Sequence, residues 1–217
     1  MSAPAPRSPL SQARLYLLAS ASASVLPLVV AVEAAIRGGV DLVQLREKDL
    51  DDATLLAQAR SLLAVCRAHR VPFIVNDRIA VALELGADGV HLGQDDDPIW
   101  QARATLPSGC IVGVSTHTSA ELDRALDCHA DYVGVGAVFP TSTKTTPVRV
   151  SGPADLAPLV ARAEEAGVPA FAIGGIDGSN VGQVAAAGMQ RIAVCSGILG
   201  SDDPEGAARE LLRALDS

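Results

Sequence analysis

Short runs of apolar residues alternate along this chain with longer segments in which apolar residues recur at helical spacing. The first apolar run is Leu15 to Leu18, and a helix-length segment, Leu28 to Arg37, follows it. The second run, Leu42 to Leu45, precedes a long segment from Asp52 to His69, whose apolar positions recur every three or four residues. This pattern predicts buried strands that alternate with helices carrying one apolar face.

The same alternation continues to the end of the chain. The remaining predicted strands are residues 73–75, 90–92, 110–114, 132–139, 170–173 and 192–195, and the remaining predicted helices are residues 79–86, 99–106, 119–128, 155–166, 181–187 and 204–215. Eight strand–helix units with right-handed crossovers predict an α/β fold, a closed (β/α)8 TIM barrel. A doubly wound open sheet is the alternative, but no G-x-G-x-x-G motif follows the first strand, which weakens it as a dinucleotide-binding fold.

One barrel domain accounts for residues 13–217, because no linker or change of composition interrupts them. Residues 1–12 are rich in proline, alanine and serine, and we expect them to form a disordered tail. The uncharged stretch from Leu15 to Val32 resembles a secretory leader, but serines, Pro27 and the following Glu33 interrupt its apolar run. We therefore interpret it as a strand and a helix.

Composition narrows the choice of partners. The 217 residues are 49% hydrophobic and 3% aromatic, which suits a buried parallel sheet surrounded by alanine-rich helices. A net charge of -8 argues against nucleic acid, because duplex binding rests on a basic surface. The four cysteines show no C-x-x-C spacing, which is typical of reduced core residues in a cytoplasmic protein. We expect no membrane partner.

Two aspartates follow successive predicted strands. Asp77 lies just beyond the strand at 73–75, and Asp96 lies just beyond the strand at 90–92. Barrels and open sheets alike place their chemistry at the carboxyl ends of parallel strands, so both carboxylates are expected at one mouth, as a metal site. The alternative is that each aspartate caps a helix or a turn.

Cationic residues follow the second predicted strand. Alternation along residues 44–48 places Gln44, Arg46 and Lys48 on one side, where two cations and an amide suit a phosphate or diphosphate. The alternative is a solvated charged loop. A lyase or aldolase that forms a Schiff base with Lys48 or Lys144 is a further alternative, and it would need no metal.

Hydroxyl-rich and glycine-rich segments follow later predicted strands. Residues 139–147 combine threonines, a serine and one lysine between prolines, and predict a phosphate-binding lid over residues 140–153. Gly174-Gly175 and the segment 195–197 follow strands seven and eight, where barrels commonly bind phosphate. Ser115 and His117 follow strand five and could hydrogen-bond a ligand. Because Mg²⁺ combines one or two carboxylates with substrate phosphates, we expect a transferase with diphosphate as leaving group.

Taken as a set, these motifs resemble the thiamine-phosphate synthase family. The matching segments are V-Q-L-R-E-K-D (43–49), I-V-N-D-R-I-A-V-A-L-E-L-G-A-D-G-V-H-L-G-Q-D-D (74–96), G-V-S-T-H-T (113–118), F-P-T-S-T-K (139–144), A-I-G-G-I (172–176) and C-S-G-I (195–198). The resemblance covers nearly the whole chain after residue 14. It implies a (β/α)8-barrel transferase that joins 4-amino-2-methyl-5-hydroxymethylpyrimidine diphosphate to a (carboxy)thiazole phosphate, giving thiamine phosphate and diphosphate through a dissociative pyrimidine-cation mechanism.

The resemblance also implies roles for individual residues. The pyrimidine diphosphate would contact Gln44, Leu45, Arg46, Glu47, Lys48, Asn76, Ser115 and Lys144, of which Arg46, Lys48, Ser115 and Lys144 are the implied catalytic residues. The thiazole phosphate would contact Thr141, Ser142, Thr143, Gly175, Cys195 and Ser196, and Mg²⁺ would bind Asp77 and Asp96. The implied partners are small phosphorylated substrates, and a homodimer is compatible with this reading.

The chain departs from the family's pattern mainly on the thiazole side. Ala19-Ser20 stand where an acidic residue is often found, Gly136-Ala137 replace a commoner Gly-Pro, and Cys195 and Gly197 replace commoner valine and alanine. A relative similar to thiazole tautomerase, or a non-catalytic barrel that binds thiazole phosphate, is therefore the alternative. Such relatives typically lack the full Gln/Arg/Lys and Asp/Asp set that this chain has.

Overall fold

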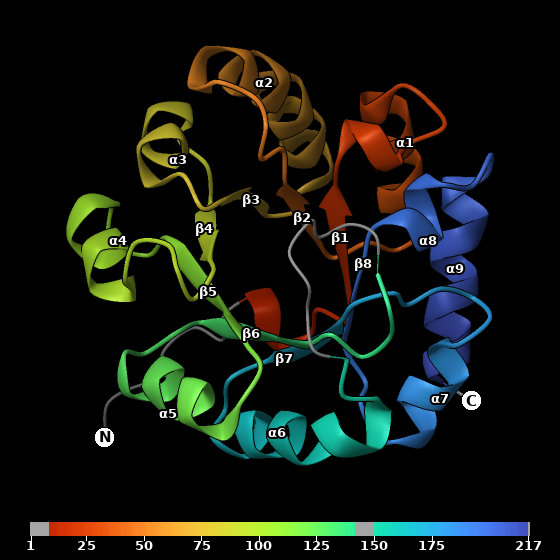
Figure 1. The fold of residues 1–217 in the computed structure, drawn as a ribbon. Coiled ribbons are helices and arrows are strands. Elements are labelled where there is room, and N and C mark those ends of the chain that lie inside the picture. Colours follow the sequence, from red (N-terminus) through yellow and green to blue (C-terminus); the bar gives the residue numbers. More distant parts are fainter. Residues whose placement is uncertain (1–8, 142–149, 217) are drawn as a thin grey trace, which may run out of the picture.

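Eight parallel strands close into a barrel in the computed structural model, which describes residues 9–141 and 150–216 (Figure 1). The strands are β1 (Leu15–Ala19), β2 (Leu42–Leu45), β3 (Phe73–Asn76), β4 (Gly89–Leu92), β5 (Ile111–Thr116), β6 (Tyr132–Gly136), β7 (Ala170–Ile173) and β8 (Ile192–Val194). They follow one another in sequence order, and β8 returns to pair with β1, with Leu15 opposite Ile192. The predicted (β/α)8 barrel is confirmed, and the open sheet is wrong.

Helices surround the barrel on the outside (Figure 1). They are α1 (Leu28–Arg37), α2 (Asp52–His69), α3 (Ile79–Leu85), α4 (Ile99–Thr105), α5 (Ser119–Asp127), α6 (Pro153–Glu165), α7 (Val181–Ala186), α8 (Ser196–Leu199) and α9 (Pro204–Leu215), with 3-10 turns η1 (Pro9–Ser11) and η2 (Ala21–Ala23). Side chains cap several helix starts, since Asp51 accepts a hydrogen bond from the Thr54 amide and Thr118 accepts one from the Glu121 amide. The predicted helices all occur, and their ends lie within a few residues of the predicted ends.

Alternating side chains of the strands divide the core into two layers. One layer fills the space between sheet and helices and includes Leu17 and Val43. The other fills the barrel interior, where Tyr16, Tyr132 and Phe171 meet edge to face with ring centroids 5.4 to 5.8 Å apart. Few aromatic residues occur in this chain, and three of them fill the barrel interior beneath the strand ends.

The amino-terminal end of the described chain packs against the barrel interior. Leu10, within η1, is fully buried in the interior layer. The Arg191 guanidinium holds this segment by donating to the carbonyl oxygens of Leu10, Ser11 and Ala13. The tail predicted over residues 1–12 is therefore wrong for residues 9–12, because one buried leucine among prolines and serines gives no periodic signal. Residues 1–8 lie outside the described part of the chain.

Two other local features differ from the sequence prediction. The sixth strand ends at Gly136 instead of residue 139, although the amides of Val138 and Phe139 still donate to the carbonyls of Ile173 and Gly174. The short helix α8 was not expected, because four residues are too few to display helical spacing. Both differences lie at the carboxyl ends of strands.

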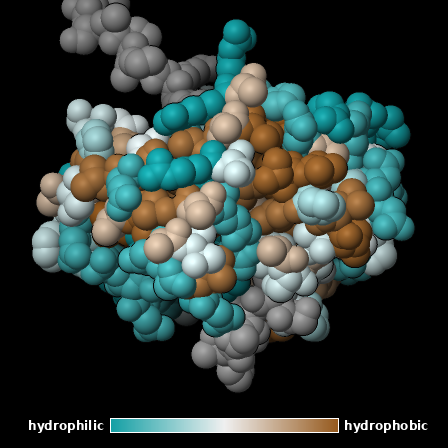
Figure 2. Space-filling model, turned by 90° about the horizontal axis from the view of Figure 1, so that it is seen from above, coloured by the Kyte–Doolittle hydropathy of each residue, from teal (hydrophilic) through white to brown (hydrophobic). Residues whose placement is uncertain are grey.

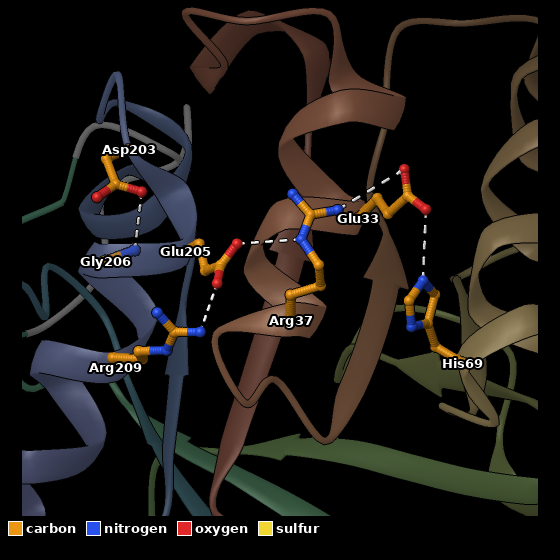
Figure 3. Close-up of polar contacts among 7 residues, drawn as sticks. All are labelled: Glu33, Arg37, His69, Asp203, Glu205, Gly206 and Arg209. Carbon is orange, nitrogen blue, oxygen red and sulfur yellow. Dashed lines mark hydrogen bonds and ion pairs between the residues drawn. The ribbon is translucent and has the colours of Figure 1, made fainter.

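Polar contacts join the last helix, α9, to α1, and α1 to α2 (Figure 3). Glu205 on α9 pairs with Arg37 on α1, 3.0 Å from its Nε, and with Arg209. Glu33 on α1 reaches both Arg37 and, at 3.4 Å, the Nε2 of His69 at the end of α2. These partly exposed pairs contribute little individually, but they lie where the carboxyl-terminal helix completes the ring.

Apolar residues gather on the outer face near α1 and α2, which Figure 2 shows in brown between hydrophilic residues in teal. The side chains of Val25 and Val30 contribute to the exposed apolar surface. Within the described residues, no helix combines the length and apolarity that crossing a membrane requires.

Candidate active site

A cavity of about 430 Å³ opens at the carboxyl ends of the strands. Side chains that follow β2, β3 and β4 line one side of it, among them Arg46, Lys48 and Asp96. Segments that follow β7 and β8 line the opposite side, including Gly175 and Ser196. The barrel therefore brings the chemically distinctive segments of the sequence around one opening.

Two carboxylates meet on the first side. β3 and β4 are neighbouring parallel strands with Asn76 opposite His91, so the residues that follow them come together. The backbone of Asp77 has a positive φ of 61° and is held by a 2.8 Å bond from its amide to the His91 carbonyl. The Asp96 carboxylate turns back to accept the Gly93 amide at 2.7 Å. The juxtaposition expected from the sequence is thus present.

The charge balance of this pair favours a bound cation. The pKa of the Asp77 carboxyl is raised to about 6, first by burial and then by a hydrogen bond to Asp96 and the charge of Asp96, while Lys48, whose Nζ lies 3.2 Å from the Asp77 carboxylate, acts to lower it. A divalent ion would stabilise the charged form of Asp77 beside Asp96. Among the described residues no larger group of His, Cys, Asp and Glu suited to a metal occurs, and a pair suits Mg²⁺, which completes its shell with phosphate and water.

Side chains of residues 44–48, at the end of β2 and just after it, point alternately into the cavity and away from it. Gln44, Arg46 and Lys48 line the cavity, as the alternation of the strand predicts. Leu45 is buried between the sheet and the helices instead. The Glu47 carboxylate points to η2, where it accepts hydrogen bonds from the Ala21 amide and the Ser20 hydroxyl. Leu45 and Glu47 thus lie away from the cavity.

The opposite wall is formed by backbone and small side chains. Gly175 has a φ of 61°, and a Cβ there would lie 2.2 Å from the Pro140 carbonyl oxygen, so only glycine fits. Cys195 and Ser196 line the same wall, and Thr141 lies at its edge. Ser142, Thr143 and Lys144 lie outside the described residues, as does most of the predicted lid.

Several cavity residues were not singled out by sequence reasoning. Tyr16 and His91 line its floor, and Gln94 bridges neighbouring strand ends by donating from Nε2 to the Ser115 carbonyl at 2.6 Å. His117, which was expected from the sequence as a possible ligand contact, also lines the cavity, and the Glu121 carboxylate accepts its amide at 2.6 Å. A polar residue at an inward position of a predicted strand, such as His91 between Val90 and Leu92, is the signal that could have identified the floor.

These features define a class of protein: a (β/α)8 barrel with a cavity at the carboxyl ends of its strands, lined by paired carboxylates, cationic side chains and a glycine-rich wall. Residues 15–198 match the family model described as thiamine monophosphate synthase. The chain belongs to that family.

Individual relatives agree with this assignment. The chain is 48% identical over 188 residues to a thiamine-phosphate synthase from Synechococcus sp. (strain WH7803), covering 87% of this chain and 52% of that protein. It is 46% identical over 206 residues to the thiamine-phosphate synthase of Thermosynechococcus vestitus, covering 95% and 57%. The chain therefore spans about half the length of these curated relatives.

A solved structure matches over almost its whole length. It is a thiamine phosphate pyrophosphorylase from Pyrococcus furiosus, 33% identical, with a TM-score of 0.83. The match covers 95% of this chain and 97% of that one. The barrel by itself thus corresponds to almost all of that solved chain.

Proposed function

We propose that this chain is a transferase that joins 4-amino-2-methyl-5-hydroxymethylpyrimidine diphosphate to a thiazole phosphate and releases diphosphate, giving thiamine phosphate. One observation carries the proposal: a single cavity combines paired carboxylates and cations on one wall with a glycine-rich and hydroxyl-rich wall opposite. That arrangement suits two phosphorylated ligands that meet at their reacting atoms. Family membership and the names of the relatives support the same reaction.

The reaction needs stabilisation of a leaving anion more than it needs a base. The bond between the pyrimidine methylene carbon and the diphosphate oxygen breaks, and the electron pair leaves with diphosphate. The lone pair of the thiazole nitrogen then forms the new C–N bond, and no proton has to be removed from that nitrogen. In this proposal Arg46 and Lys48 bind the departing diphosphate, and Lys144, outside the described residues, has the same role.

Other residues in the proposal bind and orient the two substrates. Gln44, Asn76 and Ser115 hold the pyrimidine, while Thr141, Gly175 and Ser196 hold the thiazole phosphate together with Ser142, Thr143 and Cys195. Gln44, Asn76 and Ser115 lie on β2, β3 and β5. We assign Leu45 and Glu47 to supporting positions, because one packs outside the barrel and the other binds η2. Closure over residues 140–153 stays a prediction.

Asp77 and Asp96 are the residues that would hold Mg²⁺. When bound, the ion would supply positive charge that stabilises the leaving diphosphate. The support for this assignment is the raised pKa of the Asp77 carboxyl beside Asp96, which marks a pair that lacks compensating positive charge. Lys48 offsets only part of that charge.

The test is diphosphate release on mixing the purified chain with both substrates and Mg²⁺, with thiamine phosphate identified by mass. Stoichiometric release that requires both substrates and disappears with EDTA is the expected result. Binding of thiazole phosphate without turnover would contradict the transferase and favour the non-catalytic barrel. Borohydride trapping of a substrate on a lysine, independent of metal, would favour the Schiff-base alternative instead. Cytoplasmic location and oligomeric state stay predictions, of which the first rests on the cysteine pattern.

A further inference from the structure

A continuous chain of hydrogen bonds crosses the floor of the cavity. It begins at Gln44, whose Nε2 donates to the Tyr16 hydroxyl. The Tyr16 Oη lies 2.7 Å from the Tyr132 Oη, which lies 3.0 Å from the His91 Nδ1. His91 Nε2 then lies 3.0 Å from the Ser115 Oγ. Five strands contribute one residue each, so this hydrogen-bond chain exists only in the closed barrel.

The residues of the hydrogen-bond chain are shielded from water. Tyr16 and Gln44 are each 2% exposed, Tyr132 is fully buried and His91 is 7% exposed. Room for the Tyr132 ring is made by Gly113, where a Cβ would lie 2.0 Å from the ring's Cζ. Burial raises the pKa of both tyrosines well above the usual value, so each stays a neutral hydroxyl with one proton to donate.

The direction of the chain follows from this proton count. The Gln44 amide nitrogen can only donate, so the Tyr16 oxygen accepts and its own proton goes to Tyr132. Tyr132 then donates to the His91 Nδ1, which must be unprotonated, and the His91 proton resides on Nε2. The opposite direction would leave the buried Tyr16 proton without an acceptor, which is costly.

The residues at both ends of the hydrogen-bond chain line the cavity. At one end the Gln44 Oε1 is almost fully shielded from solvent and has no hydrogen-bond partner among the described residues. At the other end the His91 Nε2–H donates to the Ser115 oxygen, which leaves the Ser115 hydroxyl proton for a molecule in the cavity. The floor therefore presents a fixed acceptor at one end and a fixed donor at the other.

We propose that Tyr16, Tyr132 and His91 are positioning residues: the two tyrosines couple the orientation of the Gln44 amide to the His91 tautomer, and that tautomer sets Ser115 as a donor. A ligand ring with an exocyclic amino group can donate to Gln44, and a nitrogen acceptor in the same ring can accept from Ser115. A ring with an oxo group in place of the amino group has no proton to donate to Gln44. The inference rests on the proposed function for its ligand, but the tautomer itself does not.

The first test is nitrogen NMR of the ligand-free protein labelled with [15N]histidine, in mildly alkaline buffer. The His91 signal, identified by its loss in His91→Gln, is expected to report a proton on Nε2. Tyr132→Phe removes the donor to Nδ1 while keeping the ring, and it should move His91 toward a mixture of tautomers. If Tyr132→Phe does not fold, Tyr16→Phe breaks the same chain one step earlier.

The matched control is Thr116→Val. It removes another fully buried hydroxyl, which donates to the Gly134 carbonyl from the strand that carries Ser115, but it leaves the chain intact. Thr116→Val should leave the His91 signal unchanged. With the pyrimidine diphosphate, Tyr132→Phe should lower kcat/KM by roughly 3- to 10-fold, the worth of one hydrogen bond. Thr116→Val should leave kcat/KM within roughly twofold.

The two readouts separate the two proposals. A proton on Nδ1 of His91 in the wild-type protein, or a tautomer unaffected by both tyrosine variants, would overturn the hydrogen-bond chain even if the enzyme turns over. The expected tautomer and its loss in Tyr132→Phe would support the chain even if no thiamine phosphate forms. In that case the failure would belong to the proposed reaction.

Discussion

Two features of Asp77 cost free energy in the folded protein. Its backbone is left-handed, with φ of 61°, which is uncommon for a residue with a side chain, and its carboxyl pKa is raised to about 6. Neither feature benefits the folded state of the protein alone. Costs of this kind concentrate at functional positions, where a ligand offsets them.

The raised pKa of Asp77 predicts how stability depends on pH without metal. The folded-state pKa of about 6 lies above the ordinary value of 3.8, so between these values the folded protein binds a proton that the unfolded chain does not. Stability from this residue is therefore fully present below about pH 4 and is lost as pH rises through 6. Asp77→Asn should remove that loss and raise Tm at neutral pH by roughly 2–4 °C relative to wild type in EDTA.

Thermal unfolding at two pH values, one below 4 and one above 6, measures this effect. The gain of Asp77→Asn over wild type should appear only at the higher pH. The exposed Asp97 serves as control, because Asp97→Asn should show no such difference. An equal gain at both pH values would contradict the raised pKa.

Asp96 should determine metal affinity. Asp96→Asn keeps an oxygen that can accept the Gly93 amide but removes the negative charge beside Asp77. We expect Mg²⁺ binding in the presence of diphosphate, measured by calorimetry, to weaken strongly, and turnover to fall about 10²- to 10³-fold. Asp97→Asn should leave both unchanged, and normal Mg²⁺ binding by Asp96→Asn would remove the metal assignment.

At the scale of elements, the connection after β2 links the cavity to the first loop. Arg46 and Lys48 face the cavity, while Glu47 between them holds η2 through the Ala21 amide and Ser20. Gln58 on α2 also donates to Glu47, at 3.4 Å. Residues 46–48 therefore place two cations at the cavity and hold the β1–α1 loop by hydrogen bonds.

Glu47→Gln tests this division of roles. Weaker acceptance by the amide should lower the free energy of unfolding by about 1 kcal/mol, while KM for the pyrimidine diphosphate stays within about threefold. Urea unfolding and steady-state kinetics measure the two quantities, and the exposed neighbour variant Asp49→Asn is the control. A large rise in KM with unchanged stability would instead put Glu47 at the substrate.

At the scale of the whole molecule, the core inside the barrel includes a segment that looks dispensable in the sequence. Leu10 is buried with the interior residues, and Arg191 binds the carbonyls around it. Leu10→Ala should therefore lower the free energy of unfolding by about 2–5 kcal/mol, as for other fully buried leucines.

Chemical denaturation of Leu10→Ala measures this cost. Val30→Ala, at a side chain 53% exposed on α1, is the control and should change stability by less than about 0.5 kcal/mol. A cost for Leu10→Ala as small as that of Val30→Ala would mean that the segment does not stabilise the barrel.

The sequence alone determined the elements and the wall of the site that lies on consecutive strands. Periodicity is a local property, so it located the eight strands and their connecting helices, and alternation placed Arg46 and Lys48 on the cavity side. Asp77 and Asp96 could be paired from sequence because their strands are neighbours in the chain as well as in the barrel. The burial of Leu10 could not be predicted, since a single residue has no period.

Only the tertiary structure decided what lies inside the barrel. The chain from Gln44 through Tyr16, Tyr132 and His91 to Ser115 joins residues up to 116 positions apart, and no sequence spacing encodes their distances. Its direction depends on burial, which removes water as an alternative partner for each proton. Local patterns therefore specified which residues surround the mouth, whereas closure of the barrel specified which of their atoms accept and which donate.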